Sequence, residues 1–387
     1  MADISLQQVM LLGFSRLCAK YGVRSAVIRW AYAVMGCRTS ALGGHVWRCP
    51  KCDEQAVLWN SCKHRACPRC GGVERECWLE KMRGLLGLDC GYHHVVFTVP
   101  HELNPLWQWN RSWFVDQVLD ASRETMLQVL GDARWLGALP GLILTPHTWS
   151  RSLINHLHVH VLSTAGGWTS SGWKPLRYDF LAPTKVLRTI YRGKLRDRLL
   201  AGLSSGEMVL PEGWSAAKVH GVLRQLYRKE WCVNVQPRYQ HGQGVLTYLA
   251  RYARGGPLRE HQIEHLSETH VTFRYTDHRE KKTRLLRLPI EDFLFRLSEH
   301  VLDPGFQAVR YAGLYASTHR ALLAQARGWL GMAPPEEVPR LTAQDFLERR
   351  GQGDKLRCST CECRYEQREK IEPSNRAPPY REYRHAA

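Results

Sequence analysis

The segment INHLHVHVLST, residues 154–164, decides how the rest of the chain is interpreted. Its centre alternates between histidine and aliphatic residues, a pattern typical of a β-strand with one buried face. Successive side chains of a strand point to opposite faces, so His156, His158 and His160 share one face. Histidines two positions apart have Cβ atoms about 7 Å apart and can hold one cation between them. The ends of the trio, His156 and His160, are about 13 Å apart, too far for all three to share an ion easily.

A third metal ligand is expected from the neighbouring strand. The preceding segment LPGLILTPHTWS, residues 139–150, also predicts a strand. A hairpin that turns near Ser152 would place His147 opposite His158. Exposed or hydrogen-bonded histidines explain the pattern His-x-His equally well, so the residues alone leave that alternative open.

A helix is predicted over residues 242–256, GQGVLTYLARYARGG, and ends at a pair of glycines. Tyr248 and Tyr252 are four residues apart, so they lie on one face about 6 Å apart along the axis. Arg251 and Arg254 flank the tyrosines and are candidates for DNA binding. The alternative is that both tyrosines are core aromatic residues, which is the ordinary explanation of such a spacing.

Cysteines are concentrated in a turn-rich stretch that follows one or two amphipathic helices predicted over residues 1–40. Cys49 and Cys52 form one C-x2-C pair, Cys67 and Cys70 form another, and fourteen residues lie between the pairs. Two such pairs can bring four thiolates to one tetrahedral Zn²⁺. The predicted zinc is structural, because a closed thiolate shell leaves no position for substrate.

Other potential ligands accompany these pairs. Three lie in the same stretch and could complete a second site or replace a member of a pair: Cys62, His64 and His45. Three cysteines near the C-terminus, Cys358, Cys361 and Cys363, contain one C-x2-C pair but have no obvious fourth ligand. The sequence therefore favours no metal site there.

The composition points to a polyanionic partner. Lysine and arginine number 54 against 36 acidic residues, so the formal charge is 54 − 36 = +18. Each neutralised phosphate releases counterions, which favours a nucleic acid as the partner. No segment has the roughly 18 apolar residues that a membrane span needs. The N-terminus lacks the features of a signal peptide, so a reducing cytoplasm is expected, where cysteines are metal ligands or buried thiols rather than disulfides.

The order of predicted elements indicates an α+β fold with a central, largely antiparallel sheet flanked by helices. We expect N-terminal helices and a zinc-binding domain over residues 1–90. A second domain, over residues 91–278, contains the histidine strand and the helix with two tyrosines. A hairpin and helical region are expected over 279–345. The basic, proline-containing remainder, 346–387, is expected to be disordered.

Taken together, these motifs resemble the two-tyrosine HUH transposases of bacterial insertion sequences, which act by a rolling-circle mechanism. HLHVHVLSTAGG resembles the HUH motif (histidine, hydrophobic residue, histidine), and TYLARYARG resembles the paired-tyrosine helix. Three further segments resemble the family's zinc-binding domain, first nuclease strand and C-terminal region: NSCKHRACPRC, HHVVFTVPHEL and FRLSEHVLDPGFQAVRYAGLYA. The blocks follow the family's order over about residues 40–320, whereas the family's late cysteine pair is matched only by the irregular CSTCEC.

The resemblance implies an HUH-endonuclease domain in which His158 and His160 bind the catalytic ion and Tyr248 and Tyr252 are the nucleophiles. It implies Mg²⁺ or Mn²⁺ as the catalytic ion beside structural Zn²⁺. The partners it implies are single-stranded DNA, a hairpin at the transposon end and target DNA. A plasmid replication initiator or relaxase would use the same chemistry, and a non-enzymatic zinc-ribbon DNA-binding protein would use neither the histidines nor the tyrosines in catalysis.

Overall fold

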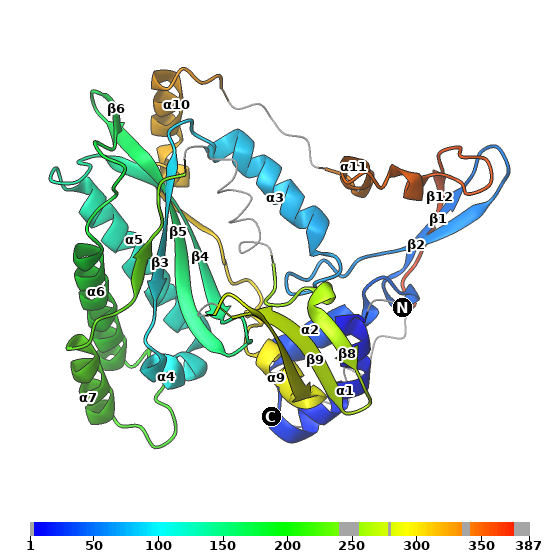
Figure 1. Cartoon of the computed structure of the whole chain (residues 1–387), viewed down its shortest axis with the longest axis horizontal. Helices are drawn as coiled ribbons and strands as arrows, with labels where there is room; N and C mark the ends of the chain where they lie inside the picture. The colour runs from blue at the N-terminus through cyan, green and yellow to red at the C-terminus, as the bar shows by residue number, and fades with distance from the viewer. Residues whose placement is uncertain (1–3, 240–254, 278–279, 335–340, 375–387) are drawn as a thin grey trace.

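The computed structural model of the chain describes residues 4–239, 255–277, 280–334 and 341–374. Figure 1 shows a central sheet with helices on both sides, a lobe built around the N-terminal helices, and an arm that carries the strands β1, β2 and β12. None of the described helices is long and apolar enough to span a bilayer.

The central sheet has the strand order β11-β4-β5-β3-β7, with β6 paired to one end of β5, and its pairings are all antiparallel. The strands are β3 (Tyr92–Thr98), β4 (Leu139–Trp149), β5 (Asn155–Thr169), β6 (Gly172–Pro175), β7 (Val233–Val235) and β11 (Arg310–Gly313). The predicted α+β class with an antiparallel central sheet is therefore confirmed. The predicted strand pair around the histidines is β4 and β5.

One face of the sheet carries the largest hydrophobic core. The aliphatic side chains of β5, namely Leu157, Val159 and Val161, pack there against the helices on that side. These helices are α4 (Asn104–Trp109), α5 (Arg111–Gly131), α6 (Thr184–Ser205) and α7 (Ala216–Tyr227). The Ser215 side chain accepts a hydrogen bond from the Lys218 amide and so caps α7.

The opposite face, to which the histidines of β5 belong, carries a smaller core at one end. There Leu162 and Ile143 pack with Trp78 of α3 (Gly71–Leu86) and Ala326 of α10 (Arg320–Trp329). Because side chains alternate along a strand, one register places aliphatic residues in the main core and histidines on the other side.

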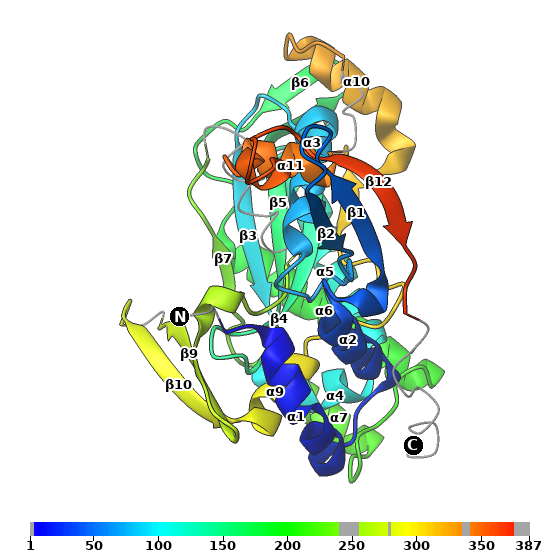
Figure 2. The same ribbon diagram turned by 90° about the vertical axis from the view of Figure 1, so that its right-hand side faces the viewer.

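A second core unites segments that are far apart in the sequence. It contains α1 (Leu6–Tyr21), α2 (Ser25–Gly36), α9 (Ile290–Ser298) and the three-stranded sheet β8 (Ile263–Leu266), β9 (His270–Thr276) and β10 (Thr283–Pro289). Helices α1 and α9 lie side by side (Figure 2), and a Cβ at Gly13 would overlap Ile290 Cγ2, so the glycine permits their close approach. Short 3₁₀ helices connect the elements: η1 (Ser40–Leu42), η2 (His101–Leu103), η3 (Glu260–Gln262), η4 (Ser317–His319) and η5 (Gly353–Leu356).

The arm is a three-stranded antiparallel sheet of order β12-β1-β2. Its strands are β1 (Gly44–Arg48), β2 (Gln55–Trp59) and β12 (Glu366–Ile371). Helix α11 (Ala343–Arg349) precedes β12 in the sequence. The expectation of disorder beyond residue 346 is thus wrong as far as residue 374. β12 is polar and mostly exposed, and backbone pairing with β1 holds it, so its sequence carries no hydrophobic pattern.

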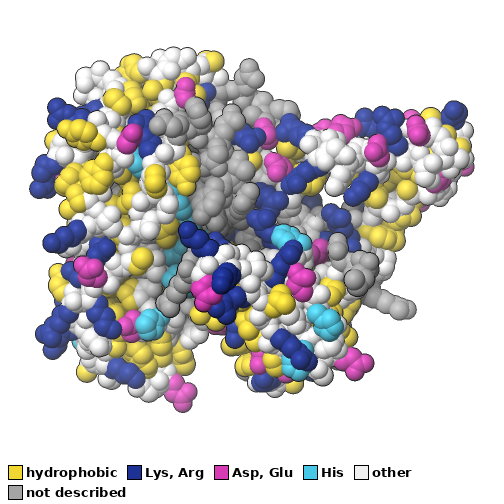
Figure 3. Space-filling model, in the orientation of Figure 1, with side chains coloured by type: hydrophobic (Ala, Val, Ile, Leu, Met, Phe, Trp, Pro, Cys, Tyr) yellow, Lys and Arg dark blue, Asp and Glu magenta, His cyan; other side chains and the backbone are white. Residues whose placement is uncertain are grey.

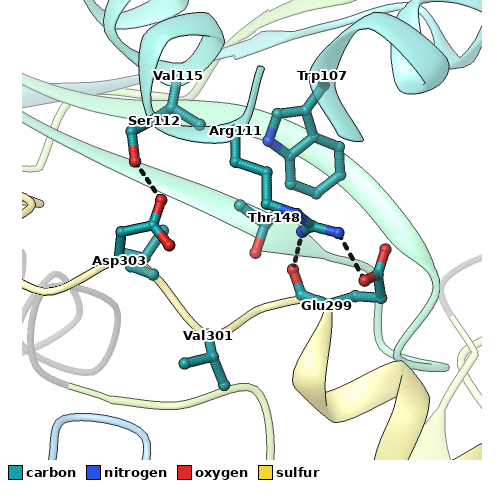
Figure 4. Close-up of a pocket in the computed structure, with 9 residues that line it drawn as sticks. Trp107, Arg111, Ser112, Val115, Thr148, Glu299, Val301 and Asp303 are labelled. Atoms are coloured by element: carbon teal, nitrogen blue, oxygen red, sulfur yellow. Dashed lines mark hydrogen bonds and ion pairs between the residues drawn. The ribbon is translucent and has the colours of Figure 1, made fainter. Parts of the chain in front are cut away.

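A partly buried ion pair joins the two large cores. Arg111 of α5 donates to the Glu299 carboxylate at 2.6 Å and to the Glu299 carbonyl at 2.8 Å, just beyond the end of α9 (Figure 4). Nearby, Asp303 accepts hydrogen bonds from Ser112 at 2.6 Å and from Arg24 at 2.8 Å. Burial raises the pKa of Glu299, but Arg111 outweighs this effect, and the pKa lies below its usual value.

Replacing Arg111 with Met should lower the free energy of unfolding by about 2 kcal/mol, between the values for exposed and fully buried pairs, because Glu299 would remain partly buried without its partner. Since the folded-state pKa of Glu299 is depressed, the stabilisation by the pair is present above the unfolded-state pKa of about 4.3 and is lost as the pH falls through the folded-state value. Denaturant unfolding of the variant and the wild type as a function of pH measures both effects.

The surface pair of Arg134, whose side chain is 78% exposed, with Asp132 provides the control. Arg134→Met should leave the denaturation midpoint unchanged. Equal midpoints for Arg111→Met and the wild type would show that the Arg111–Glu299 pair does not stabilise the fold.

Candidate functional site

Three histidines converge on one side of the central sheet. His147 of β4 pairs directly with His158 of β5, and the turn between the two strands lies at residues 150–154, so the predicted hairpin is confirmed. His160 follows on the same face of β5, and one ring nitrogen from each of the three lies within 4.8 Å of the others. The ring centroids are 4.5 to 5.2 Å apart. We call His147, His158 and His160 the histidine triad.

His156 lies at the exposed edge of this group and orients its neighbour. Its carbonyl oxygen is 2.8 Å from Nδ1 of His158. Because a carbonyl oxygen can only accept, His158 carries its proton on Nδ1 and keeps a lone pair on Nε2. The fourth histidine of the sequence pattern therefore fixes a tautomer suited to metal binding, and it does not belong to the triad itself.

A further histidine, His94 of β3, was not singled out by the sequence. Its Nε2 lies 2.7 Å from Nδ1 of His160, and the two rings are nearly parallel at 10°. His94 is 2% exposed. The pattern HHVVFTVP predicts the strand, but only the pairing of β3 with β5 shows which of the two histidines faces His160.

Burial keeps these imidazoles neutral. It lowers the pKa of His158 to about 4 and that of His94 to about 4. Burial, together with the charge of neighbouring imidazoles, also lowers the pKa values of His147 and His160 well below the usual range. Neutral rings offer lone pairs at neutral pH, and no carboxylate of the described residues joins the triad. Three imidazoles suit a transition-metal ion such as Mn²⁺ better than Mg²⁺.

A chain of contacts connects the triad to His300, which follows Glu299 of the ion pair between the two large cores. The Trp149 ring stacks on His147 with centroids 4.3 Å apart, and His300 lies 5.9 Å beyond Trp149. His300 contacts Thr148 Oγ1 and the Leu153 carbonyl, both at 3.1 Å. The turn of the hairpin that presents His147 is therefore held by the segment that follows α9.

The predicted nucleophiles and their arginines, Tyr248, Tyr252, Arg251 and Arg254, lie outside the described residues. Described residues close to either side of this segment, Tyr239 and Gly256, lie against other parts of the fold. Tyr239 pairs with Tyr92 at the start of β3, and Gly256 approaches Ala66 closely enough that a Cβ would lie 3.2 Å from its Cα.

The cysteines form two groups rather than one. The first cysteine cluster contains Cys37, Cys62, Cys67 and Cys70, and the second contains Cys49, Cys52, Cys358 and Cys361. In each cluster the four Sγ atoms lie within 4.8 Å of one another. The expectation that Cys49 and Cys52 share a site with Cys67 and Cys70 is therefore wrong.

The reason is the geometry of the β1–β2 hairpin. It carries the Cys49–Cys52 turn out along the arm, whereas the Cys67–Cys70 turn packs in the second core against Cys37 at the end of α2. Cys62 joins the first cluster, 3.5 Å from Cys70. His45 and His64 join neither cluster: they contact the Gln367 side chain and the Ala66 amide.

Two of the ligands of the first cluster fall outside any C-x2-C pair, so spacing rules could not find Cys37 and left Cys62 among alternatives. Four thiol side chains at these separations fit a tetrahedral structural Zn²⁺, and a thiolate shell fits neither Mg²⁺ nor Ca²⁺.

Comparison with known proteins finds two protein families and two relatives that are similar to this chain. Residues 141–321 match the protein family described as "Putative transposase", and residues 12–99 match the "Transposase zinc-binding domain". The chain is 31% identical over 82% of its length to "Putative transposase y4qJ" of Sinorhizobium fredii, of which 81% is covered. It is 28% identical over 91% of its length to the "Transposase for insertion sequence element IS801" of Pseudomonas savastanoi pv. phaseolicola, of which 85% is covered.

Among solved structures, TrwC complexed with a 27-mer DNA that comprises a recognition hairpin and cleavage site is similar over 41% of this chain and 71% of that chain. The identity is 15% and the TM-score is 0.22.

Replacing Cys67 with Ser should remove about one equivalent of zinc per chain and lower the melting temperature, because a structural zinc site contributes its binding energy to folding. Metal analysis and thermal unfolding of protein purified without added zinc measure both. Cys232→Ser is the control, since Cys232 is exposed and belongs to neither cluster. A Cys67→Ser protein with wild-type zinc content and melting temperature would contradict the assignment.

Proposed function

Since the chain belongs to the IS91-type transposase family, with a transposase zinc-binding domain in its N-terminal part, we propose that it cuts and rejoins single-stranded DNA in rolling-circle transposition. The proposed nucleophiles are Tyr248 and Tyr252. The histidine triad is proposed to hold the divalent catalytic ion, Mn²⁺ or Mg²⁺.

The observation that carries this proposal is the triad itself: three neutral imidazoles from two paired strands, on the face of the sheet that the main core leaves free. An ion bound there would polarise a scissile phosphate and stabilise the charge that develops on its oxygens. The carbonyl of His156 and the ring of His94 hold two of the three imidazoles in orientation. Such outer contacts commonly fix the tautomer and the direction of metal-binding histidines.

In the proposed reaction the tyrosine Oη attacks a DNA phosphorus atom. A bond between Oη and phosphorus forms as the bond to the 3′ oxygen breaks, and the phenolic proton is finally carried by the free 3′-hydroxyl. The product is a 5′-phosphotyrosine, which conserves the phosphodiester energy, so rejoining needs no ATP. Because the pKa of a free tyrosine is about 10, the proton must be removed or the phenolate favoured by nearby positive charge.

Two tyrosines one helical turn apart would permit two strand transfers in succession. One tyrosine would hold the first cut end while the second accepts another strand. The proposed partners are single-stranded DNA, the hairpin at a transposon end and target DNA, with Arg251 and Arg254 as candidate phosphate contacts. The net charge of +18 supports a polyanionic partner, and Figure 3 shows Lys and Arg side chains on the half with α6 and α7 as well as on the half with the arm.

The double variant Tyr248→Phe/Tyr252→Phe should bind a single-stranded oligonucleotide but form no covalent adduct, because only the attacking oxygens are lost. Each single variant should still nick and yet fail to complete transposition, since one phosphotyrosine cannot hold two strand ends. Denaturing electrophoresis with labelled oligonucleotide, followed by peptide mapping of the adduct, measures the first step.

Tyr178→Phe serves as the matched control, since Tyr178 is 67% exposed, and it should form the adduct normally. An adduct mapped to a residue other than Tyr248 or Tyr252 would refute the assignment. A wild-type chain that binds DNA and never forms an adduct would favour the non-enzymatic zinc-ribbon DNA-binding alternative.

His94 is proposed to position His160, and His94→Leu should weaken Mn²⁺ binding about ten- to a hundredfold, as the loss of an outer hydrogen bond typically does. His94→Gln should restore part of the affinity because its amide oxygen can accept the bond from Nδ1 of His160. The readout is free Mn²⁺ measured by electron paramagnetic resonance during titration of the full chain.

His93→Leu is the control, because His93 lies on the opposite face of β3 and contacts the Gln236 carbonyl. Its Mn²⁺ affinity should match that of the wild type. Wild-type affinity in His94→Leu would rule out the positioning role.

A further inference from the structure

The second cysteine cluster brings together two segments from the N-terminal and C-terminal parts of the chain. Cys49 and Cys52 follow β1, whereas Cys358 and Cys361 come about three hundred residues later and precede β12. In the arm β12 pairs with β1 in antiparallel register, from Gly44 opposite Ile371 to Arg48 opposite Glu366. The cluster lies at the end of this pairing, where both strands continue into tight turns.

The distances between the sulfur atoms suit a single tetrahedral ion. Cys49 Sγ lies 3.3 Å from Cys361 Sγ, and Cys52 Sγ lies 3.4 Å from Cys358 Sγ and 3.6 Å from Cys361 Sγ. Four sulfur atoms at Zn–S distances of 2.3 Å in a tetrahedron would be about 3.8 Å apart. The cluster therefore needs to expand by only a few tenths of an ångström to accept the ion.

The two turns have the same backbone conformation, which is an independent observation. In the first, the Asp53 amide donates to the Cys49 carbonyl at 3.1 Å, and the Cys49 amide donates to the Glu54 carbonyl at 2.8 Å. In the second, the Glu362 amide donates to the Cys358 carbonyl at 3.0 Å, and the Cys358 amide donates to the Cys363 carbonyl at 2.9 Å.

The match extends to the dihedral angles. Asp53 and Glu362, each four residues after the first cysteine of its turn, have φ values of 63° and 58°. Non-glycine residues rarely adopt this left-handed conformation, and it persists where the surroundings require it. Two segments about three hundred residues apart, each with the pattern Cys-x2-Cys followed by an acidic residue, thus adopt the same turn and present two cysteines each to one point.

Hydrophobic packing does not explain the arrangement. Cys49 and Cys358 are 1% and 2% exposed, yet no cysteine of this cluster belongs to any of the three hydrophobic cores of the described residues. By contrast, Cys37, Cys67 and Cys70 of the first cluster are part of the second core. Glu54 strengthens the link between the two turns by accepting hydrogen bonds from Ser359 and Thr360, both at 2.9 Å.

We propose that Cys49, Cys52, Cys358 and Cys361 bind a second structural Zn²⁺, which fastens the C-terminal segment to the N-terminal zinc-binding domain. Small sheets without a core commonly depend on such a metal for stability. Loss of the ion releases β12 from β1, because the exposed strand buries too little surface to hold itself. Cys52 is exposed and the first cluster is enclosed, so a chelator removes this ion first.

The test uses the full chain in wild-type form and as Cys358→Ser/Cys361→Ser. The wild type should contain two thiolate-bound zinc ions per chain and the double variant one. Cobalt substitution distinguishes these ions from a metal on the histidine triad, because only cysteine ligands give sulfur-to-cobalt charge-transfer absorption. Cys363→Ser is the control, since Cys363 belongs to the same turn and to neither cluster, and it should keep both ions.

Hydrogen exchange provides the second readout and does not require the variant to fold. Mild chelation of the wild type should expose the amides of β12 and β1 while the amides of α2 stay protected. A wild-type chain with one thiolate-bound ion, a double variant that keeps two, or unchanged exchange in β12 after removal of the first ion would each overturn the proposal.

Discussion

The antiparallel pairing of β4 with β5 is the constraint on which the rest of the site depends. Its register places His147 opposite His158 and, through strict alternation, directs Leu157 and Val159 into the main core. A slip of one residue would bury the histidines among aliphatic side chains and expose the core residues. The hydrophobic energy of the core therefore fixes the geometry of the triad, and the fold and the chemistry cannot vary independently.

The two cysteine clusters and the Arg111–Glu299 pair connect parts of the chain that are distant in the sequence. The first cluster lies within the second core, where α1 and α2 pack with α9, and the ion pair joins that core to α5. The loop beyond α9 then supports the hairpin turn through His300. A path of direct contacts thus runs from the zinc-binding region to the strand that carries His147, so the position of the triad relative to that region is determined by packing.

Local patterns in the sequence were sufficient for the β4–β5 hairpin and for the three histidines that it brings together. Alternation predicted β5, a short turn predicted the hairpin, and the pairing of His147 with His158 followed from both. The failures all involve contacts between distant segments. Cys37 has no neighbour at knuckle spacing, and Cys358 finds its partners about three hundred residues away. The role of His94 depends on which strand lies beside β5, which periodicity does not specify, and β12 has no hydrophobic face from which to predict it.

In the proposed function, the histidine triad holds an ion in contact with a DNA phosphate. Pulsed electron paramagnetic resonance of the full chain, loaded with Mn²⁺ and bound to a single-stranded oligonucleotide, tests this most directly because it detects nuclei next to the ion. If the triad holds this ion, coupling to imidazole nitrogen and to DNA phosphorus should appear in the same spectrum, and both should be lost in His160→Ala. Phosphorus coupling without nitrogen coupling, or a spectrum unchanged by His160→Ala, would contradict it.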